Sequence, residues 1–158
     1  MPRSFKATAQ TLAQAAAASV LATAAASATA QASPTPPTSP QASAMHIAIT
    51  LDGRHRLRAQ LQDNPSSRAL LASLPLDLPL EDFAEEKIVR LPHKLSSQDA
   101  PASYRGQPGD ITYYAPWGNL ALFYGSGPNA PGLVYLGRFE GSYSPLRNAR
   151  HIRIEAAP

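Results

Sequence analysis

The residues around Asp52-Gly53 limit the fold of this chain more than any other part of its sequence. Asp-Gly between two alternating runs is the strongest short-range signal for a β-hairpin. The alternation covers residues 45–51 before the turn and residues 54–61 after it. A period of two places every second side chain on one face of a strand. The sequence therefore predicts two antiparallel strands with an inward apolar face, made of Ile47, Ile49, Leu51, Leu57, Ala59 and Leu61.

The residues after this hairpin predict one helix and a series of short strands. Asn64 can cap a helix that begins with Pro65 and continues to Leu74, and Pro75 stops it. Many short strands without helices between them favour a closed barrel or a sandwich over a parallel sheet. The other predicted elements are strands over residues 76–80, 86–91, 110–115, 119–124, 133–139 and 151–155, a helical turn over residues 143–148, and loops over residues 96–108 and 125–132.

The first 30 residues have the features of an export signal. Arg3 and Lys6 make a positive start, an uncharged alanine-rich stretch follows, and Ala28-Thr29-Ala30 is a small-residue cleavage pattern. The stretch is too diluted by polar residues to predict a transmembrane span. This interpretation predicts a periplasmic or secreted protein.

Residues 31–44 contain four prolines among Ser, Thr, Gln and Ala, and they predict a disordered linker before a domain over residues 45–158. Met45 stands directly before the first predicted strand, which leaves a second interpretation open. If translation starts at Met45, residues 1–44 are upstream sequence and the protein is cytoplasmic.

Composition excludes several classes of function. The chain has no cysteine, so disulfides, thiolate metal sites and cysteine nucleophiles are excluded. Arg3 and Lys6 supply two of its three net positive charges, so the domain lies near +1, too weakly basic to predict nucleic-acid binding. The four histidines lack metal-ligand spacing, and His55 is predicted to point inward. No phosphate-binding loop or nucleophile motif is present, so no cofactor or metal is predicted.

One long motif extends from Pro108 to Tyr124 and reads Pro-Gly-Asp-Ile-Thr-Tyr-Tyr-Ala-Pro-Trp-Gly-Asn-Leu-Ala-Leu-Phe-Tyr. Together with the stretches at residues 61–65, 74–83, 86–95 and 132–138, it resembles the small bacterial cyclophilin-like fold proteins. The resemblance covers residues 45–156 and implies a mainly β fold. That fold is a closed antiparallel eight-stranded barrel with one or two short helices and adjacent first and last strands. The family has no firmly assigned general activity.

The turn inside this motif is the leading candidate for a ligand site. Aromatic rings give rigid apolar walls, an asparagine amide offers a donor and an acceptor, and a strand-to-strand turn can leave them at the mouth of a barrel. Such a surface suits a proline-containing peptide or a small apolar ligand. The alternative is that the aromatic side chains plug the barrel end as part of the core. The candidate residues are Tyr113, Tyr114, Pro116, Trp117 and Asn119.

Two arginines on predicted strands complete the candidate site. Arg90 and Arg138 carry planar guanidinium groups that can hold a carboxylate in two parallel hydrogen bonds. The alternative for Arg138 is a structural ion pair with Glu86 or Glu140, of the kind that contributes little to stability.

A set of outward-facing arginines lies on the first hairpin and the last predicted strand. If those strands are neighbours, the side chains form one basic patch that could face an anionic partner. The alternative is an ordinary solvated surface. The patch residues are Arg54, Arg56, Arg58 and Arg153, with His46 and His151 beside them.

Two classes of function follow from these patterns. The first is a non-catalytic module that binds a small molecule or peptide at an aromatic barrel mouth. The second, suggested by the fold resemblance alone, is a peptidyl-prolyl isomerase or a chaperone-like factor. True cyclophilins share a Phe-His-Arg stretch with the catalytic arginine and a Gln-Gly-Gly-Asp stretch, and neither occurs in this chain. Fold does not imply activity, so the binding module is the favoured prediction.

Overall fold

A computed structural model describes residues 45–98 and 100–158, so the predicted export signal and linker, residues 1–44, lie outside the described residues. The described residues form eleven strands, one α-helix and one 3-10 helix. In chain order the elements are β1 (Met45–Leu51), β2 (His55–Leu61), α1 (Pro65–Ala72), β3 (Leu76–Pro79), β4 (Glu81–Phe83), β5 (Glu86–Arg90), β6 (Ser103–Arg105), β7 (Asp110–Tyr114), β8 (Asn119–Phe123), β9 (Asn129–Pro131), β10 (Leu133–Glu140), η1 (Ser144–Asn148) and β11 (His151–Ala156).

The predicted hairpin is present as β1 and β2. Asp52 and Gly53 both have positive φ, +48° and +66°, the conformation in which Asp-Gly turns are favoured. The pairing ends at Leu51 opposite His55, so the connection is one residue longer than predicted and Arg54 belongs to the turn. The prediction that His55 points inward is wrong. Its place next to the turn leaves the side chain exposed to solvent.

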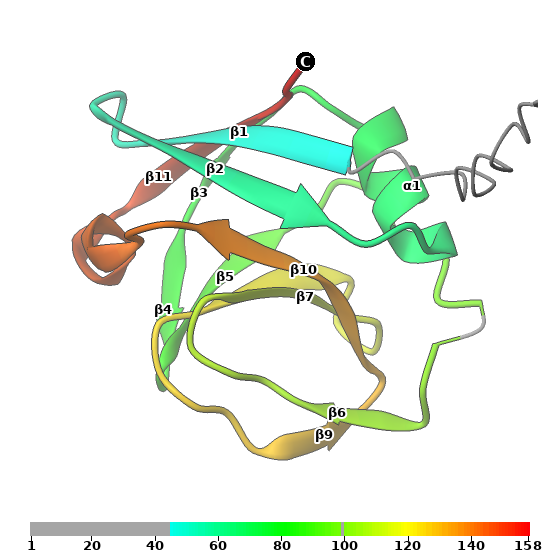
Figure 1. Ribbon diagram of the computed structural model, residues 1–158. Helices are drawn as coiled ribbons and strands as arrows, with labels where there is room; N and C mark the ends of the chain where they lie inside the picture. The colour runs from blue at the N-terminus through cyan, green and yellow to red at the C-terminus, as the bar shows by residue number, and fades with distance from the viewer. Residues whose placement is uncertain (1–44, 99) are drawn as a thin grey trace, which may run out of the picture. The chain divides into compact units, whose positions relative to one another are not determined.

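One antiparallel sheet of nine strands forms a nearly closed barrel, in the order β3-β11-β1-β2-β10-β7-β8-β5-β4. β3 and β4 lie at opposite edges of the sheet, although Leu80 alone separates them in the chain. The segment therefore runs from one edge to the other and brings the edges together (Figure 1). If β3 and β4 are counted as one bent strand, the sheet has eight strands. The predicted eight-stranded cyclophilin-like barrel is therefore confirmed. β1 pairs with β11, so the first and last strands are neighbours as predicted.

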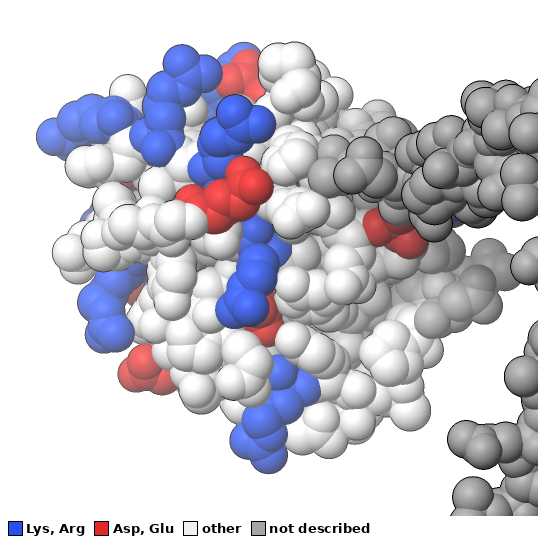
Figure 2. All heavy atoms as spheres, viewed as in Figure 1, with Lys and Arg blue, Asp and Glu red and all other residues white. Residues whose placement is uncertain are grey.

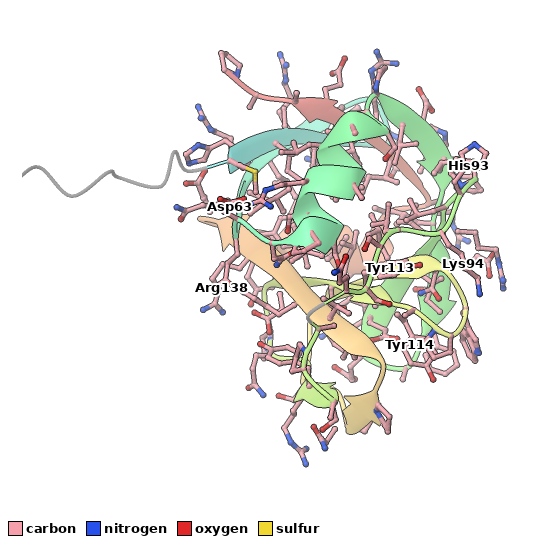
Figure 3. The ribbon with its side chains drawn as sticks, turned by 90° about the vertical axis from the view of Figure 1, so that its right-hand side faces the viewer. Asp63, His93, Lys94, Tyr113, Tyr114 and Arg138 are labelled. Atoms are coloured by element: carbon pink, nitrogen blue, oxygen red, sulfur yellow. The ribbon has the colours of Figure 1, made fainter. Side chains whose placement is uncertain are left out.

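The barrel interior is filled by the apolar side chains that the alternation predicted. Ile47, Ile49 and Leu51 are fully buried in the main core. Helix α1 lies against one end of the barrel (Figures 1 and 3), where Leu70 joins the same core. The side chain of Asn64 accepts a hydrogen bond from the backbone N–H of the third helical residue at 2.8 Å, as expected of a helix cap.

The two predicted loops contain short strands that pair with each other. β6 and β9 form a separate two-stranded sheet, with Tyr104 opposite Ala130. The side chain of Asn129 donates a hydrogen bond to the Ser103 hydroxyl at 3.0 Å across this pair. The prediction of plain loops over residues 96–108 and 125–132 is therefore wrong for these two strands. Their partners are far apart in the chain, and neither segment shows alternation long enough to predict a strand.

Candidate functional site

The wall made by β7 and β8 is buried on both of its faces. Leu120 and Leu122 point into the main core, whereas Ala121 and Phe123 belong to a second apolar cluster on the outer face of the barrel. The β6–β9 sheet covers part of this outer face, and Tyr104 of β6 packs against the cluster. A strand buried on both faces has no polar side to face water, which explains the continuous apolar run in its sequence.

Two glycines let the covering loops approach Phe123 closely. A Cβ atom at Gly106 or at Gly127 would lie 2.4 Å from the Phe123 ring, so any other residue there would force the ring or the loop to move. The N–H of Gly127 donates a hydrogen bond to the carbonyl of Gly106 at 2.9 Å and ties the two loops together. The glycine content of residues 125–132 therefore has a steric reason.

This cover leaves a hollow of about 230 Å³ beside the outer cluster. The hollow is lined by the outer-face residues of β5 and β8, by residues 83–86, by Tyr114 and Trp117 at the β7–β8 turn, and by the loop before β9. The hollow thus lies on the outside of the barrel wall, whereas the sequence placed the candidate site at the barrel mouth; ligand binding at either place stays a prediction. The strand alternation turns Tyr114 and Asn119 outward at the turn, opposite to Tyr113 and Leu120.

Aromatic side chains form one border of the hollow. Trp117 is 55% exposed and Phe83 is 49% exposed, the two large apolar side chains most open to solvent in the described residues. Their rings meet edge to face at 5.7 Å between centroids, and Trp117 meets Tyr114 in the same way at 5.4 Å. Such contacts hold the rings in a defined arrangement. An exposed aromatic group beside a hollow marks a candidate contact site for a ligand.

Asn119 is the predicted site residue with the most unusual environment. It lines the hollow but is only 2% exposed. Its Nδ2 donates a hydrogen bond to the carbonyl of Leu120 at 3.0 Å, which directs the amide oxygen away from that carbonyl. Among the described residues, this Oδ1 is the buried side-chain oxygen that has no hydrogen-bond partner. A buried acceptor left unpaired costs free energy and is rare in native proteins.

Two adjacent glutamates contribute the charge of the hollow. Burial raises the pKa of Glu86 to about 7, because the carboxylate loses hydration without gaining a partner. Glu85 is more open to solvent and lies 3.9 Å from a nitrogen of Arg147. The described residues that line the hollow include no lysine or arginine. Sequence reasoning considered Glu86 as an ion-pair partner of an arginine, but it did not assign Glu86, Glu85 or Phe83 to the site.

The structure places the other aromatic candidates apart from the hollow. Tyr113 is fully buried in the main core, and its hydroxyl accepts a hydrogen bond from the N–H of Leu95 at 3.0 Å. Figure 3 shows Tyr113 and Tyr114 directed to different places although they are adjacent in β7. Pro116 is exposed, and its ring lies against Gly132. The alternative that the aromatic side chains belong to the core therefore applies to Tyr113. In contrast, Tyr114, Trp117 and Asn119 line the hollow.

Neither candidate arginine lines the hollow. Arg90 makes two hydrogen bonds to Glu81, at 2.8 and 3.1 Å, on the exposed surface. Arg138 lies 3.5 Å from a carboxylate oxygen of Asp110 and donates a hydrogen bond to a backbone carbonyl. The partner of Arg138 is therefore Asp110 and not Glu86 or Glu140. Figure 3 shows Arg138 on the other side of the view from Tyr114.

The arginines of the first hairpin and the last strand share a surface, as the sequence predicted. Figure 2 shows Lys and Arg side chains gathered over the part of the barrel that carries β1 and β2. Acidic residues lie among them: Glu140 is 3.6 Å from Arg58, and Asp77 is 3.3 Å from Arg153. Arg54 and Arg56 are exposed at the hairpin end. Binding of an anionic partner here stays a prediction.

The structural class of this protein is a nearly closed antiparallel barrel whose outer face is partly covered by the β6–β9 sheet. The profile of the cyclophilin-like family matches residues 49–155, so the chain belongs to that family. Among solved structures, it is similar to the solution structure of the hypothetical protein AF2241 from Archaeoglobus fulgidus. The TM-score is 0.54 with 19% sequence identity, over 72% of this chain and 95% of the archaeal chain. Comparison with curated proteins finds no match.

Within residues 45–98 and 100–158, no helix is long and apolar enough to cross a membrane. In the same residues, no three side chains of the metal-binding types are close enough to share an ion.

Proposed function

We propose that this domain is a non-catalytic binding module, and that the hollow on the outer face of the β7–β8 wall holds an apolar group of a small molecule or peptide. The observation that carries the proposal is the exposure of Trp117 and Phe83 at the border of a hollow lined by buried apolar residues. Keeping two large aromatic side chains in water is unfavourable for the isolated domain. Covering them with a ligand recovers that free energy.

The size of the hollow supports a small occupant. Sites for drug-sized ligands usually measure about 300–1,000 Å³, and this hollow measures about 230 Å³. An engineered cavity of about 150 Å³ is large enough for benzene. The hollow therefore suits one aromatic ring or one apolar side chain of a peptide, with the remainder of the ligand lying over Trp117.

The positions of the arginines favour binding over isomerase chemistry. The alternative function is a peptidyl-prolyl isomerase, and true cyclophilins use a catalytic arginine for that reaction. Arg90 and Arg138 each have an acidic partner, and neither lines the hollow. A protease-coupled isomerisation assay on the full chain separates the two functions. We expect no turnover, and turnover that disappears in Arg90→Ala or Arg138→Ala would contradict the binding module.

Filling the hollow tests the proposal directly. Ala130 lines the hollow and is half-buried, so Ala130→Phe places a ring inside it. A matched control is Ala156→Phe, an exposed position at the end of β11. A fragment library would be screened against the full chain by ligand-observed NMR and by emission of Trp117, which is the single tryptophan. We expect Ala130→Phe to abolish binding of the fragments and Ala156→Phe to retain it. Equal binding to both variants would overturn the proposal.

A further inference from the structure

The charges around the hollow are of one sign. Glu85 and Glu86 line it, and the described lining residues contribute no Lys or Arg. The guanidinium of Arg147 is already engaged, because it lies 3.9 Å from Glu85 and 4.6 Å from the ring centroid of Tyr124. Glu85 therefore has a cation nearby, whereas no Lys or Arg among the described lining residues neutralises the negative charge of Glu86. The domain carries a small net positive charge, so the charge of the hollow is opposite in sign to that of the whole domain.

Glu86 lies between two phenylalanines in the sheet. Its strand partners are Phe83 on β4 and Phe123 on β8. The ionisable side chains that share the hollow are Glu85 and Tyr114, and Arg147 reaches this region from η1 through its contact with Glu85. A half-buried carboxylate in such a place lacks both full hydration and a counterion. A bound cation would supply the missing counterion and stabilise the ionised form.

The aromatic border suits a cation as well. The ring of Trp117 lies nearly perpendicular to the rings of both Phe83 and Tyr114 and contacts each of them edge to face. The faces of aromatic rings, and of tryptophan most strongly, attract ammonium groups. The unpaired Oδ1 of Asn119 adds a hydrogen-bond acceptor to the wall, although it is buried and a ligand reaches it only if lining side chains shift.

The geometry points to a small organic amine as the ligand of this hollow, with its apolar group among Ile88, Ala121 and Phe123 and its ammonium group directed to Glu86. This inference rests on the proposed function and narrows it to one chemical class. The amine matches the hollow in shape and in charge. The apolar lining accepts one ring or a short alkyl group, and the charge of the lining selects a cation over a neutral or anionic ligand of the same shape.

The test compares three probes of similar shape and different charge: phenethylamine, 2-phenylethanol and phenylacetate. Each is titrated into the full chain at pH 8, with Trp117 emission and ligand-observed NMR as readouts. We expect phenethylamine to bind at least about tenfold more tightly than the alcohol, and the carboxylate to bind most weakly. Glu86→Gln removes the charge and keeps the shape of the side chain. The variant should therefore bind phenethylamine and 2-phenylethanol about equally tightly. Glu140→Gln is the matched control, because that glutamate is exposed on β10 and does not line the hollow.

A pH series on the unmodified chain repeats the test without any substitution. Phenethylamine stays protonated from pH 8 to pH 5.5, whereas Glu86 takes up a proton over this range. The amine preference should therefore weaken as the pH falls, and Glu86→Gln should show no such change. A thermal melt checks that both variants fold.

The possible results separate the two proposals. If the alcohol binds as tightly as the amine at pH 8, the amine inference is overturned and the hollow remains a binding site. If the preference survives Glu86→Gln, the role of Glu86 is overturned. If none of the probes binds at millimolar concentration and the fragment library also gives no ligand, the proposed function fails together with the inference.

Discussion

The inner and outer faces of the β7–β8 wall come from the same stretch of sequence but are closed in different ways. On the inner face, Tyr113, Leu120 and Leu122 have no exposed surface, because strands from the whole barrel surround them. On the outer face, Phe123 is covered by two short strands and their loops, and Tyr114 stays partly exposed. The inner face has no room for a ligand, whereas the outer face retains a hollow.

The difference teaches that burial on its own does not distinguish a core from a site. Phe123 is as well buried as many core residues, with 2% of its surface exposed. Its cover depends on the loop that contains Gly127 and on a sheet of two three-residue strands. Such a cover has few packed neighbours and can open at a lower free energy than the barrel itself. We therefore expect substitutions on the two faces to differ in their effects.

The largest effect is expected on the inner face. Leu122→Ala removes a fully buried side chain from a surface that cannot collapse, and it should lower the free energy of unfolding by about 3–5 kcal/mol. Leu133→Ala makes the same change in the outer cluster, beside the hollow, where the cover can relax. It should cost about 2 kcal/mol. Urea denaturation followed by circular dichroism measures both. An equal loss in the two variants would break the distinction between the faces.

Gly127→Ala tests how the outer cover is held. The new Cβ would lie 2.4 Å from the Phe123 ring, so the loop or the ring must shift at a cost of about 1–3 kcal/mol. Ser126→Ala, at the exposed neighbouring position, should stay within about 0.5 kcal/mol of the unmodified protein. Thermal melts compare the two. If Gly127→Ala proves harmless, the loop is not packed against Phe123 as tightly as the structure indicates.

Glu86 should make stability depend on pH in a way that the inner face does not. Its pKa in the folded state is about 7, above the ordinary value of 4.5, so folding favours the protonated form. The contribution is complete below pH 4.5 and is lost as the pH rises through about 7. Because the group is half-exposed and solvent screens it, the loss should be on the order of 1 kcal/mol. Melting curves of Glu86→Gln and the unmodified chain should diverge between pH 5 and pH 8, with the variant the more stable at pH 8. Parallel curves would show that Glu86 is hydrated.

The smallest effect is expected at Arg90, which sequence reasoning assigned to the site and the structure places outside the hollow. Its hydrogen-bonded pair with Glu81 is exposed, and such pairs contribute at most about 1 kcal/mol. Arg90→Ala should therefore change stability by about 0.5 kcal/mol and leave fragment binding unchanged. Isothermal titration with a fragment found in the library screen measures the second point. Loss of binding in this variant would extend the site beyond the hollow.

Local patterns were enough to predict most of the barrel. The alternation around Asp52-Gly53 predicted the first hairpin, and Asn64-Pro65 predicted the start of α1, because turn and cap preferences act over a few residues. The β6–β9 pair could not be predicted in this way. Ser103 and Asn129 meet although they are 26 positions apart in the chain, and the two segments that hold them show turn-forming residues rather than alternation. Pairing between such segments depends on the barrel that brings them together.

Resemblance of its motifs to the cyclophilin-like family implied the barrel, and the sequence by itself determined the strands of the first hairpin and the aromatic turn that contains Trp117. It did so because side-chain periodicity and turn chemistry decide which residues share a face of a strand. Tertiary structure alone decided what covers each face. It turned Tyr113 inward and placed Phe83 and Glu86 beside Trp117. The physical reason is that a hollow consists of surfaces from segments distant in the chain, and its shape follows from how those segments pack rather than from the pattern within any one of them.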